Sequence, residues 1–586
     1  MIHHLFHLAS SILTSHFLLV WLFFLVVVVA GGLLLSTVRD PIAFSSLRQH
    51  ASDNAARVQL QFSAGDGISL ILFCLFAMFY MSVILYKEDF CYYDDDLLTE
   101  FSVQGKNFGP PIWNGDRFFP LSDQEFNLLR FVTRSPFGYH SLVVVQLAIL
   151  IVLIFLILKD LKVRYRCLVT AAAMLAPSFL IPFMGFVYPE RNVLFGLAIL
   201  LLCLQGYSKT RSRLYFVGCL VATHFILYYK ETAVLFVVAF AASRAILQTY
   251  RARGGGVRSW GHIAAENALS IGFLGVAAIY TVLFLVVMLP HRNFSYIAAT
   301  QHPLGPVLAV YLQFDCLPFL LLGVFLLRLG RCLLWQMELD PLWDSLAVGA
   351  IAYFIGILAL RINSGYYMAP VDFIAIFYLA HMARLWLRKP VRVRVFSIAG
   401  IVIAFMSQAA VYSSARAIER KGTIAAKAGL AEFLENYLPS VHNDSVELFF
   451  PYSNGYHLMG LSSYLNYKGF RLEGQGDSGS KTGPKIIFKG RERFVDNKCI
   501  GYRDYSCIHA EDPSPGALVV VLPDDSVSID ELRGIAKDFP QLFYMDCPVC
   551  TAHPRLFNLL HAISAEYSLS PLPGHWLQLH VFQRPI

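Results

Sequence analysis

Three consecutive aspartates, Asp94–Asp96, lie in a polar stretch of the chain, residues 87–140, that separates two apolar runs. Tyr93 precedes them directly, and Arg117 and Glu125 follow in the same stretch. Crowded carboxylates repel one another and raise each other's pKa, which suits a general base or a site for a divalent cation. The alternative is a solvated acidic loop with aromatic residues at a membrane surface.

Four later polar turns each present a cation beside an aromatic ring or a polar amide. These cations are Arg191, Lys230, Arg292 and Arg361. In the first two turns an acidic neighbour, Glu190 or Glu231, can neutralise the cation, and any short turn needs polar side chains. Four such turns at one face of a membrane, opposite an acidic loop, nevertheless favour a cleft that binds phosphate.

The composition indicates that a bilayer must surround the elements that carry these residues. Hydrophobic residues make up 56% of the 586 residues and charged residues only 15%, against roughly 25% charged in a soluble domain. A soluble core could not bury so much apolar side chain. The net charge of +7 comes from short basic clusters between apolar runs. Because no helix carries a basic stripe, we expect no nucleic-acid partner.

Twelve apolar runs predict about 12 membrane-spanning helices. They lie near residues 17–36, 68–86, 141–158, 167–186, 193–206, 214–229, 232–247, 264–289, 305–327, 344–361, 371–386 and 395–413. The run at 193–206 is short for a span of roughly 20 residues, so its helix should extend at either end. The first run lacks a preceding basic region and a small-residue cleavage site, so we do not expect a cleavable signal peptide.

The distribution of Lys and Arg predicts the orientation. Six alternate loops between the runs hold 21 basic residues, whereas the intervening loops, including 87–140, hold nine. The positive-inside rule places the first set in the cytoplasm. We therefore expect a multi-pass protein of the cell (inner) membrane, whose 87–140 loop and C-terminal part lie outside the cytoplasm.

The C-terminal part, residues 414–586, contains no spanning run. We expect it to form a separate extracytoplasmic α/β domain that follows the membrane domain of residues 1–413 in the chain. A helical pattern, Ile424 to Tyr437, precedes short apolar strands. These strands are Val446–Phe450, Lys485–Phe488, Ala517–Leu522 and Leu577–Phe582.

Four cysteines of this domain are spaced for two disulfides or one zinc site. They are Cys499, Cys507, Cys547 and Cys550. An oxidising compartment favours disulfides over zinc, and the connectivity stays open.

The membrane part, roughly residues 68–413, resembles the GT-C superfamily of membrane glycosyltransferases, which includes the protein O-mannosyltransferases and the lipid A aminoarabinose transferases. The resemblance is carried by an acidic pair that opens the first large outside loop, a following Gly, a Pro-bearing stretch and a late Tyr-Tyr-x-x-Pro turn. In this chain these are Asp94–Asp96, Gly105, Pro110-Pro111 with Arg117–Pro120, and Tyr366–Pro370. The chain departs from the pattern by a third Asp and by one extra span ahead of the loop.

The resemblance implies transfer of a sugar from a polyprenyl-phosphate-linked donor, with inversion, on the outer face of the membrane. The acceptor would be a glycan, a lipid or a protein. Asp95, followed by Asp94 and Asp96, would supply the base, and Asp94 and Asp95 would hold a divalent cation (Mg or Mn) if one is needed. The donor phosphate would meet Lys230, Arg292, Arg361 and Arg191. Substrate contacts would come from Tyr93, Arg117, Glu125, Glu231, Tyr366 and Tyr367.

Three other functions fit parts of the sequence. An O-antigen polymerase or ligase also has many spans, but its largest loop tends to come late. A secondary transporter or flippase for a lipid-linked substrate would place charges deep in the bilayer. Asp315, about ten residues into the run 305–327, is the clear candidate for such a deep charge. A membrane scaffold would leave the acidic loop and the cationic turns without a purpose.

The orientation predicts the behaviour of reporter fusions. A reporter that is active only outside the cytoplasm should be active when fused after residue 420 and inactive when fused near residue 255. Activity measured in intact cells checks this, and the reverse pattern would overturn both the topology and the functional argument built on it.

Overall fold

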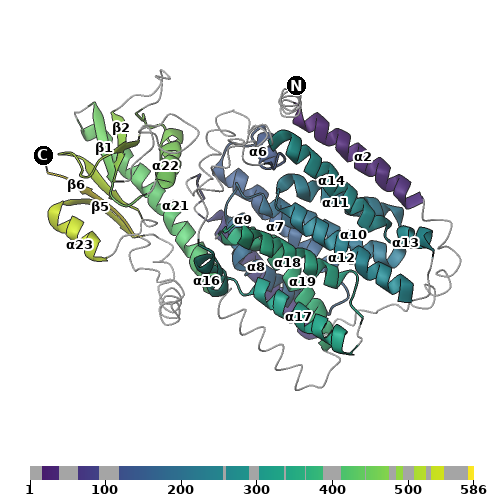
Figure 1. Cartoon of the computed structure of the whole chain (residues 1–586). Helices are drawn as coiled ribbons and strands as arrows, with labels where there is room; N and C mark the ends of the chain where they lie inside the picture. The colour runs from purple at the N-terminus through teal and green to yellow at the C-terminus, as the bar shows by residue number, and fades with distance from the viewer. Residues whose placement is uncertain are drawn as a thin grey trace.

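The computed structural model shows a helical bundle with a smaller domain of mixed helix and strand at one end of it (Figure 1). The structure describes residues 16–37, 64–86, 88–90, 118–254, 259–288, 303–335, 338–362, 364–386, 411–441, 444–453, 455–473, 484–491, 507–522, 529–546 and 578–585. The helix α21 (Val411–Tyr437) leads from the bundle into the smaller domain (Figure 1).

The bundle consists of long helices joined by short turns. Its elements are α2 (Phe17–Thr37), α5 (Ala64–Leu85), α6 (Gln124–Leu129), α7 (Pro136–Ile157), α8 (Val163–Met174), α9 (Pro177–Met184), α10 (Glu190–Thr210), α11 (Arg213–Tyr229), α12 (Ala233–Gly254), α13 (Trp260–Glu266), α14 (Ala268–Met288), α16 (Leu304–Phe314), α17 (Leu317–Trp335), α18 (Trp343–Ala359), η5 (Gly365–Met368) and α19 (Ala369–Trp386).

Seven of the described helices are long and apolar enough to cross a membrane. They are α2, α5, α7, α10, α12, α14 and α17, and α8 with α9 raises the number to eight if the bent pair forms one span. Large side chains such as Leu19, Phe23 and Ile71 face outward from the bundle, as lipid contact requires. The finer count of about 12 spans stays a prediction, and most of its last run, residues 395–410, lies outside the described residues.

Two of the predicted runs are broken rather than continuous. The helices α8 and α9 meet at 70°, because Ala176 precedes Pro177 and adopts an extended conformation (ψ 135°). The run 305–327 breaks at Asp315, which is extended (φ −145°) and accepts a hydrogen bond from the Leu317 N–H at 3.2 Å. The run 305–327 is therefore not one continuous helix, since Asp315 ends α16 and caps α17; the depth of Asp315 in the membrane stays a prediction.

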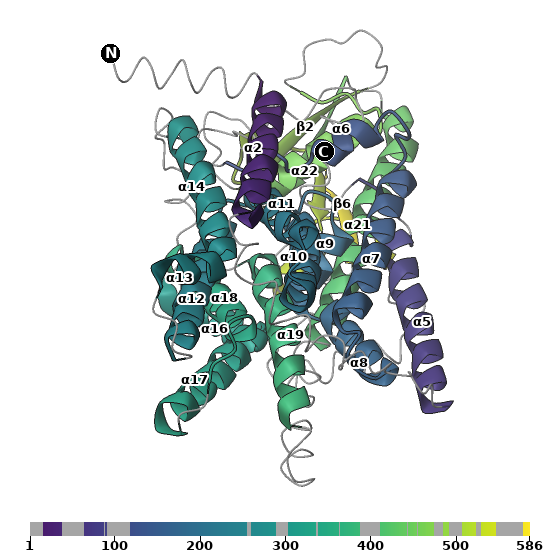
Figure 2. The same ribbon diagram turned by 90° about the vertical axis from the view of Figure 1, so that its right-hand side faces the viewer.

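The two ends of the bundle differ in what lies next to them (Figures 1 and 2). The domain end is the one that faces the smaller domain: α5 and α11 finish there, and α7, α10, α12 and α19 begin there. The far end is the opposite one, where α7, α10 and α19 finish and α18 begins.

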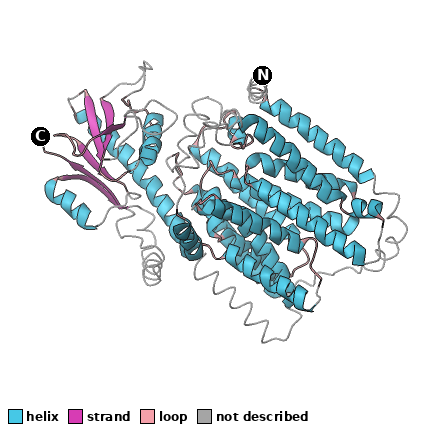
Figure 3. Ribbon diagram, viewed as in Figure 1, coloured by secondary structure: helices cyan, strands magenta, loops and turns pink. Residues whose placement is uncertain are grey.

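The smaller domain is built on a six-stranded mixed sheet with the order β3-β2-β1-β4-β6-β5 (Figure 3). Its strands are β1 (Ser445–Phe450), β2 (Lys485–Gly490), β3 (Cys507–His509), β4 (Leu518–Val521), β5 (Gln541–Asp546) and β6 (Gln578–Gln583). β3, β2, β1 and β4 are parallel, and β6 runs antiparallel to both β4 and β5. The four strands predicted from short apolar runs are confirmed, as is the small α/β arrangement.

Alternation along the strands explains how helices cover both faces of the sheet. Leu448 and Phe450 pack with α21 (Val411–Tyr437) and α22 (Gly455–Tyr467), whereas Phe449 packs on the other side with α23 (Ile529–Asp538). Cys507 begins β3, and the other three cysteines assigned to disulfides, Cys499, Cys547 and Cys550, lie outside the described residues.

Candidate functional site

The domain end of the bundle gathers buried charged side chains from several turns. Glu190 and Arg191 form the first turn of α10 and are both fully buried. Lys230 follows α11 in an extended conformation, which turns the chain sharply into α12. The 3-10 helix η5 brings Tyr366 and Tyr367 to the start of α19. Ionisable groups buried in a membrane bundle are costly and mark functional sites.

A buried ion pair joins two of these turns. Lys230 Nζ lies 2.6 Å from Glu190 Oε1, and the two side chains are 3% and 0% exposed. The ammonium also lies 4.0 Å from the centre of the Tyr367 ring and 6.0 Å from that of Tyr366. A cation over an aromatic face gains further stabilisation when water is excluded. The pair thus connects two turns, whereas the simplest interpretation of the sequence paired each residue with its neighbour in the chain.

The aromatic rings around Lys230 form one wall of this site. Tyr366 and Tyr367 stack with their centroids 4.7 Å apart, and Tyr188 meets Tyr366 edge-on at 4.9 Å. The second oxygen of Glu190, Oε2, accepts no hydrogen bond from the described residues. The site therefore combines ring faces, which suit a sugar, with a carboxylate oxygen that can still accept a hydrogen bond.

Arg191 lies beside this pair but is held mainly by the main chain. Its guanidinium donates to the carbonyl oxygens of Pro182 and Gly185 at 3.1 Å each, and its Nη2 lies 3.5 Å from Glu125 Oε1. Asn192 donates to the same Glu125 oxygen at 2.6 Å. Arg191 consequently fixes the turn between α9 and α10 and orients Glu125. Its assignment to a donor phosphate stays a prediction.

A short segment at the domain end, Glu88–Phe90, connects the bundle to the C-terminal domain, and we call it the junction segment. The Glu88 carboxylate contacts His140 of α7 and Lys421 of α21. Lys421 also donates to the carbonyl oxygens of Ile84 and Tyr86 at 3.0 Å each, so it caps the end of α5. Burial lowers the pKa of Lys421 to about 7, so its charge at neutral pH depends on these partners.

The next two residues of the junction segment contact α22 of the C-terminal domain. Asp89 Oδ2 accepts a hydrogen bond from the Tyr464 hydroxyl at 2.8 Å and lies 2.7 Å from Lys468 Nζ. Phe90 is fully buried and meets the Tyr467 ring at 5.5 Å. The polar stretch that contains the three aspartates therefore starts from a point that both parts of the protein hold.

The chain rejoins the described bundle at Phe118, again at the domain end. Phe118 is buried, and its carbonyl oxygen accepts a hydrogen bond from the Tyr280 hydroxyl at 3.0 Å. The Leu121 N–H donates to the Tyr228 carbonyl at 3.1 Å. Both flanks of residues 91–117 are thus fixed at the end of the bundle that carries the Lys230–Glu190 pair.

A pair of buried carboxyls lies at the helix break next to η5. Asp315 accepts a hydrogen bond from the Leu317 N–H at 3.2 Å, the Ser178 hydroxyl donates to Asp372, and each carboxyl keeps one buried oxygen that accepts no hydrogen bond from the described residues. The Tyr311 hydroxyl donates to the Ile362 carbonyl at 2.8 Å, which ties α16 to the turn before η5. Buried carboxyls inside a membrane bundle are costly, so these two are candidates for a functional role.

The structure brings together some of the residues that the sequence assigned to the site. Lys230, Tyr366 and Tyr367 form one group, and Glu125 with Arg191 forms a second group. Glu231 follows Lys230 at the start of α12. Arg361 is exposed and adopts a left-handed conformation (φ 55°) after α18. The remaining assigned residues lie outside the described part of the chain: Tyr93, Asp94, Asp95, Asp96, Arg117 and Arg292.

Sequence reasoning did not single out several buried polar residues of the domain end. Asp372 is a lone acid in an apolar run, and that signal could have identified it. Glu88 belongs to the acidic stretch but was not distinguished from its neighbours. Lys421 is separated from Glu88 by 333 residues, and no local pattern predicts such a pairing.

The described residues contain no group of three or more His, Cys, Asp or Glu side chains that could hold a metal ion. Asp94 and Asp95, to which a divalent cation was assigned, are outside this part of the chain, so the assignment stays untested.

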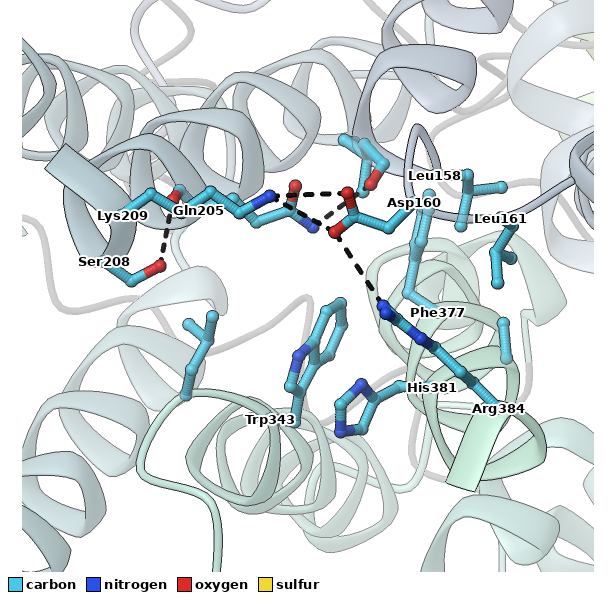
Figure 4. A pocket seen from close by; sticks show the side chains of 13 residues that line it. Leu158, Asp160, Leu161, Gln205, Ser208, Lys209, Trp343, Phe377, His381 and Arg384 are labelled. Atoms are coloured by element: carbon cyan, nitrogen blue, oxygen red, sulfur yellow. Dashed lines mark hydrogen bonds and ion pairs between the residues drawn. The ribbon is translucent and has the colours of Figure 1, made fainter. Parts of the chain in front are cut away.

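A cavity of about 160 Å³ lies at the far end of the bundle, away from the buried pairs (Figure 4). Asp160, Lys209, Trp343, His381 and Arg384 are among the residues that line it. It shares no residue with the groups described above, so it forms a separate feature of the molecule.

No protein-family model matches this chain, and no curated protein matches its sequence. The function of the chain is therefore inferred from the chemistry of its residues and from their arrangement.

The buried pair predicts a large effect on stability. Lys230→Met leaves the Glu190 carboxylate buried without its partner, which should lower the free energy of unfolding by about 3–5 kcal/mol. The double variant Glu190→Gln/Lys230→Met should recover much of this loss, because it removes both charges. Unfolding of the purified protein in detergent measures both.

The matched control is Arg251→Gln, which breaks a pair with Glu338 whose side chains are 55% and 75% exposed. Such an exposed pair contributes at most about 1 kcal/mol. Parental stability in Lys230→Met, or a double variant no better than the single one, would contradict the structural importance of the buried pair.

Proposed function

We propose that this chain is a membrane glycosyltransferase that acts at the domain end of its bundle. The observation that carries the proposal is the buried Lys230–Glu190 pair beneath the stacked rings of Tyr366 and Tyr367. It places a cation, an acceptor oxygen and two ring faces at one end of an apolar bundle. A polyprenyl-phosphate-linked sugar offers the complementary parts, namely a charged phosphate, a sugar ring and an apolar chain.

The proposed reaction is a single displacement at the anomeric carbon. The acceptor hydroxyl attacks from the face opposite the phosphate, the bond between the anomeric carbon and the phosphate oxygen breaks, and the phosphate leaves with the electron pair. The proton of the hydroxyl passes to a carboxylate, for which Asp95 is the first candidate. Lys230, with Arg292 and Arg361, would stabilise the charge that develops on the leaving phosphate.

The fixed flanks of the polar stretch support this assignment of the base. Phe90 and Phe118 are both buried at the domain end, so residues 91–117 leave and rejoin the bundle on the side of Lys230. On the second flank, the ring of Phe119 lies 5.9 Å from Lys230 Nζ. The C-terminal domain, through the junction segment, holds one of the two flanks.

The proposal also includes an orientation. We place the domain end and the C-terminal domain outside the cytoplasm of a cell (inner) membrane, with about 12 spans. The described far-end turns support this placement because they carry Lys209, Arg211 and Arg384. The acceptor would be a glycan, lipid or protein of the cell envelope.

A second candidate function is transport of a lipid-linked substrate, and it is favoured by one specific observation. Two buried carboxyls, Asp315 and Asp372, accompany a helix break, and transporters build their sites at such breaks. Proton-dependent movement of a polyprenyl-phosphate-linked sugar across vesicles, abolished by Asp372→Asn with no loss of transfer, would support this function over the first.

The enzyme proposal predicts a loss of turnover without a loss of folding. Asp95→Asn keeps the shape of the side chain and removes its basicity, so sugar transfer should fall by about 10²–10⁴-fold. Asp94→Asn and Asp96→Asn are assayed alongside, with polyprenyl-phosphate-linked sugar as donor and thermal stability as the check on folding.

Asp530→Asn serves as the control, because this exposed carboxylate of α23 pairs only with its neighbour Arg533 among the described residues. It should transfer sugar at the parental rate. Parental activity in all three variants of the aspartate run would leave the acidic stretch as a solvated surface and would favour transport.

A further inference from the structure

The far-end cavity is bounded by the ends of four helices. Leu158 and Asp160 follow α7, Lys209 belongs to the last turn of α10, and Trp343 begins α18. Arg384 belongs to the last turn of α19. The volume of the cavity, about 160 Å³, is roughly ten times the ~10–15 Å³ that one water molecule needs. It can therefore hold a group of several heavy atoms.

The charges in this cavity do not balance. Lys209 Nζ lies 3.2 Å from Asp160 Oδ2, and Arg384 Nη1 lies 3.8 Å from the same oxygen (Figure 4). One carboxylate thus serves two cations. The distance between Arg384 and Asp160 is too long for a hydrogen bond, and the Arg384 side chain is 48% exposed. A cavity with spare N–H donors and excess positive charge suits an anion with several oxygens.

The walls of the cavity indicate where that anion comes from. Trp343 and His381 stack at 4.8 Å, and Phe377 adds an apolar surface next to them. Because α7 and α10 are membrane-spanning in length and composition, their ends lie where the bilayer meets water. Tryptophan is enriched at this level, and basic pockets between helix ends bind lipid headgroups.

We propose that the far-end cavity binds the phosphate of an anionic membrane phospholipid, held by Arg384 and Lys209. The phosphate oxygens take the place of Asp160 on the guanidinium, and the acyl chains run along the apolar helices. When no lipid is bound, the Asp160 carboxylate pairs with both cations, so it competes with the lipid phosphate for them. The site is separate from the domain end and does not depend on the proposed transferase activity.

The inference is tested by lipid binding to the full-length protein in detergent, measured by native mass spectrometry with phosphatidylglycerol as the probe. Arg384→Gln and Lys209→Gln should each weaken binding about fivefold, since one basic residue near a lipid headgroup contributes roughly that factor. Asp160→Asn should strengthen binding, because it removes the competitor and leaves both cations. A merely structural role for Asp160 would not produce tighter binding.

Arg251→Gln is the matched control, because it removes an exposed cation at the same end of the bundle. It should bind the lipid as the parent does. Unchanged binding in both Arg384→Gln and Lys209→Gln, weaker binding in Asp160→Asn, or an equal loss in Arg251→Gln would overturn the proposal.

Two further probes identify the source of the phosphate. Diacylglycerol, which has the chains without the phosphate, should bind no better to the parent than to Arg384→Gln. Inorganic phosphate at equal concentration should leave lipid binding unchanged. Full displacement of the lipid by inorganic phosphate would overturn the lipid assignment and leave a site for a free anion. Sugar transfer plays no part in these measurements, so their failure would leave the proposed function untouched.

Discussion

Burial of unlike charges at one end of an apolar bundle is the constraint on which the arrangement of the turns depends. Withdrawing a single charge from water costs several kcal/mol, so a buried lysine requires a partner at close range. Lys230 finds that partner in Glu190, on a different turn, and Tyr367 covers the ammonium. If either side chain moved away, the other charge would be left buried without a partner. The start of α10, the link between α11 and α12, and η5 are consequently held in one geometry.

The same principle explains how the C-terminal domain is attached. Glu88 lies between a bundle histidine and Lys421 of α21, while Asp89 meets α22. The junction segment is therefore held from both sides, and the polar stretch that follows it starts at a fixed place. The far end holds a buried pair of its own, Arg328–Asp344, but the charges that line its cavity, Asp160, Lys209 and Arg384, are about half exposed. Buried pairs fix the geometry of the turns, whereas the charges around the cavity stay open to solvent.

Sequence reasoning predicted the elements better than it predicted their contacts. Apolar runs identified the long helices and four strands, because burial in lipid or in a sheet leaves a local pattern. β3 is only three residues long, and β5 is largely exposed at the sheet edge, so neither has such a pattern. The break at Asp315 arises from a side chain that caps the next helix, which hydropathy does not register. The Lys230–Glu190 pair could not be foreseen because Glu231 and Arg191 offered nearer partners in the chain.

The proposed function requires that the lipid-linked donor binds at the domain end, and photoaffinity labelling tests this directly. A polyprenyl-phosphate sugar carrying a photoreactive group would be cross-linked to the full chain in its membrane, and the labelled peptides mapped by mass spectrometry. Donor binding at the domain end should give labels in η5 (Gly365–Met368) and in the first turn of α10, both suppressed by excess unlabelled donor. Labelling confined to the far-end cavity, or labelling at the domain end that the donor does not suppress, would contradict it.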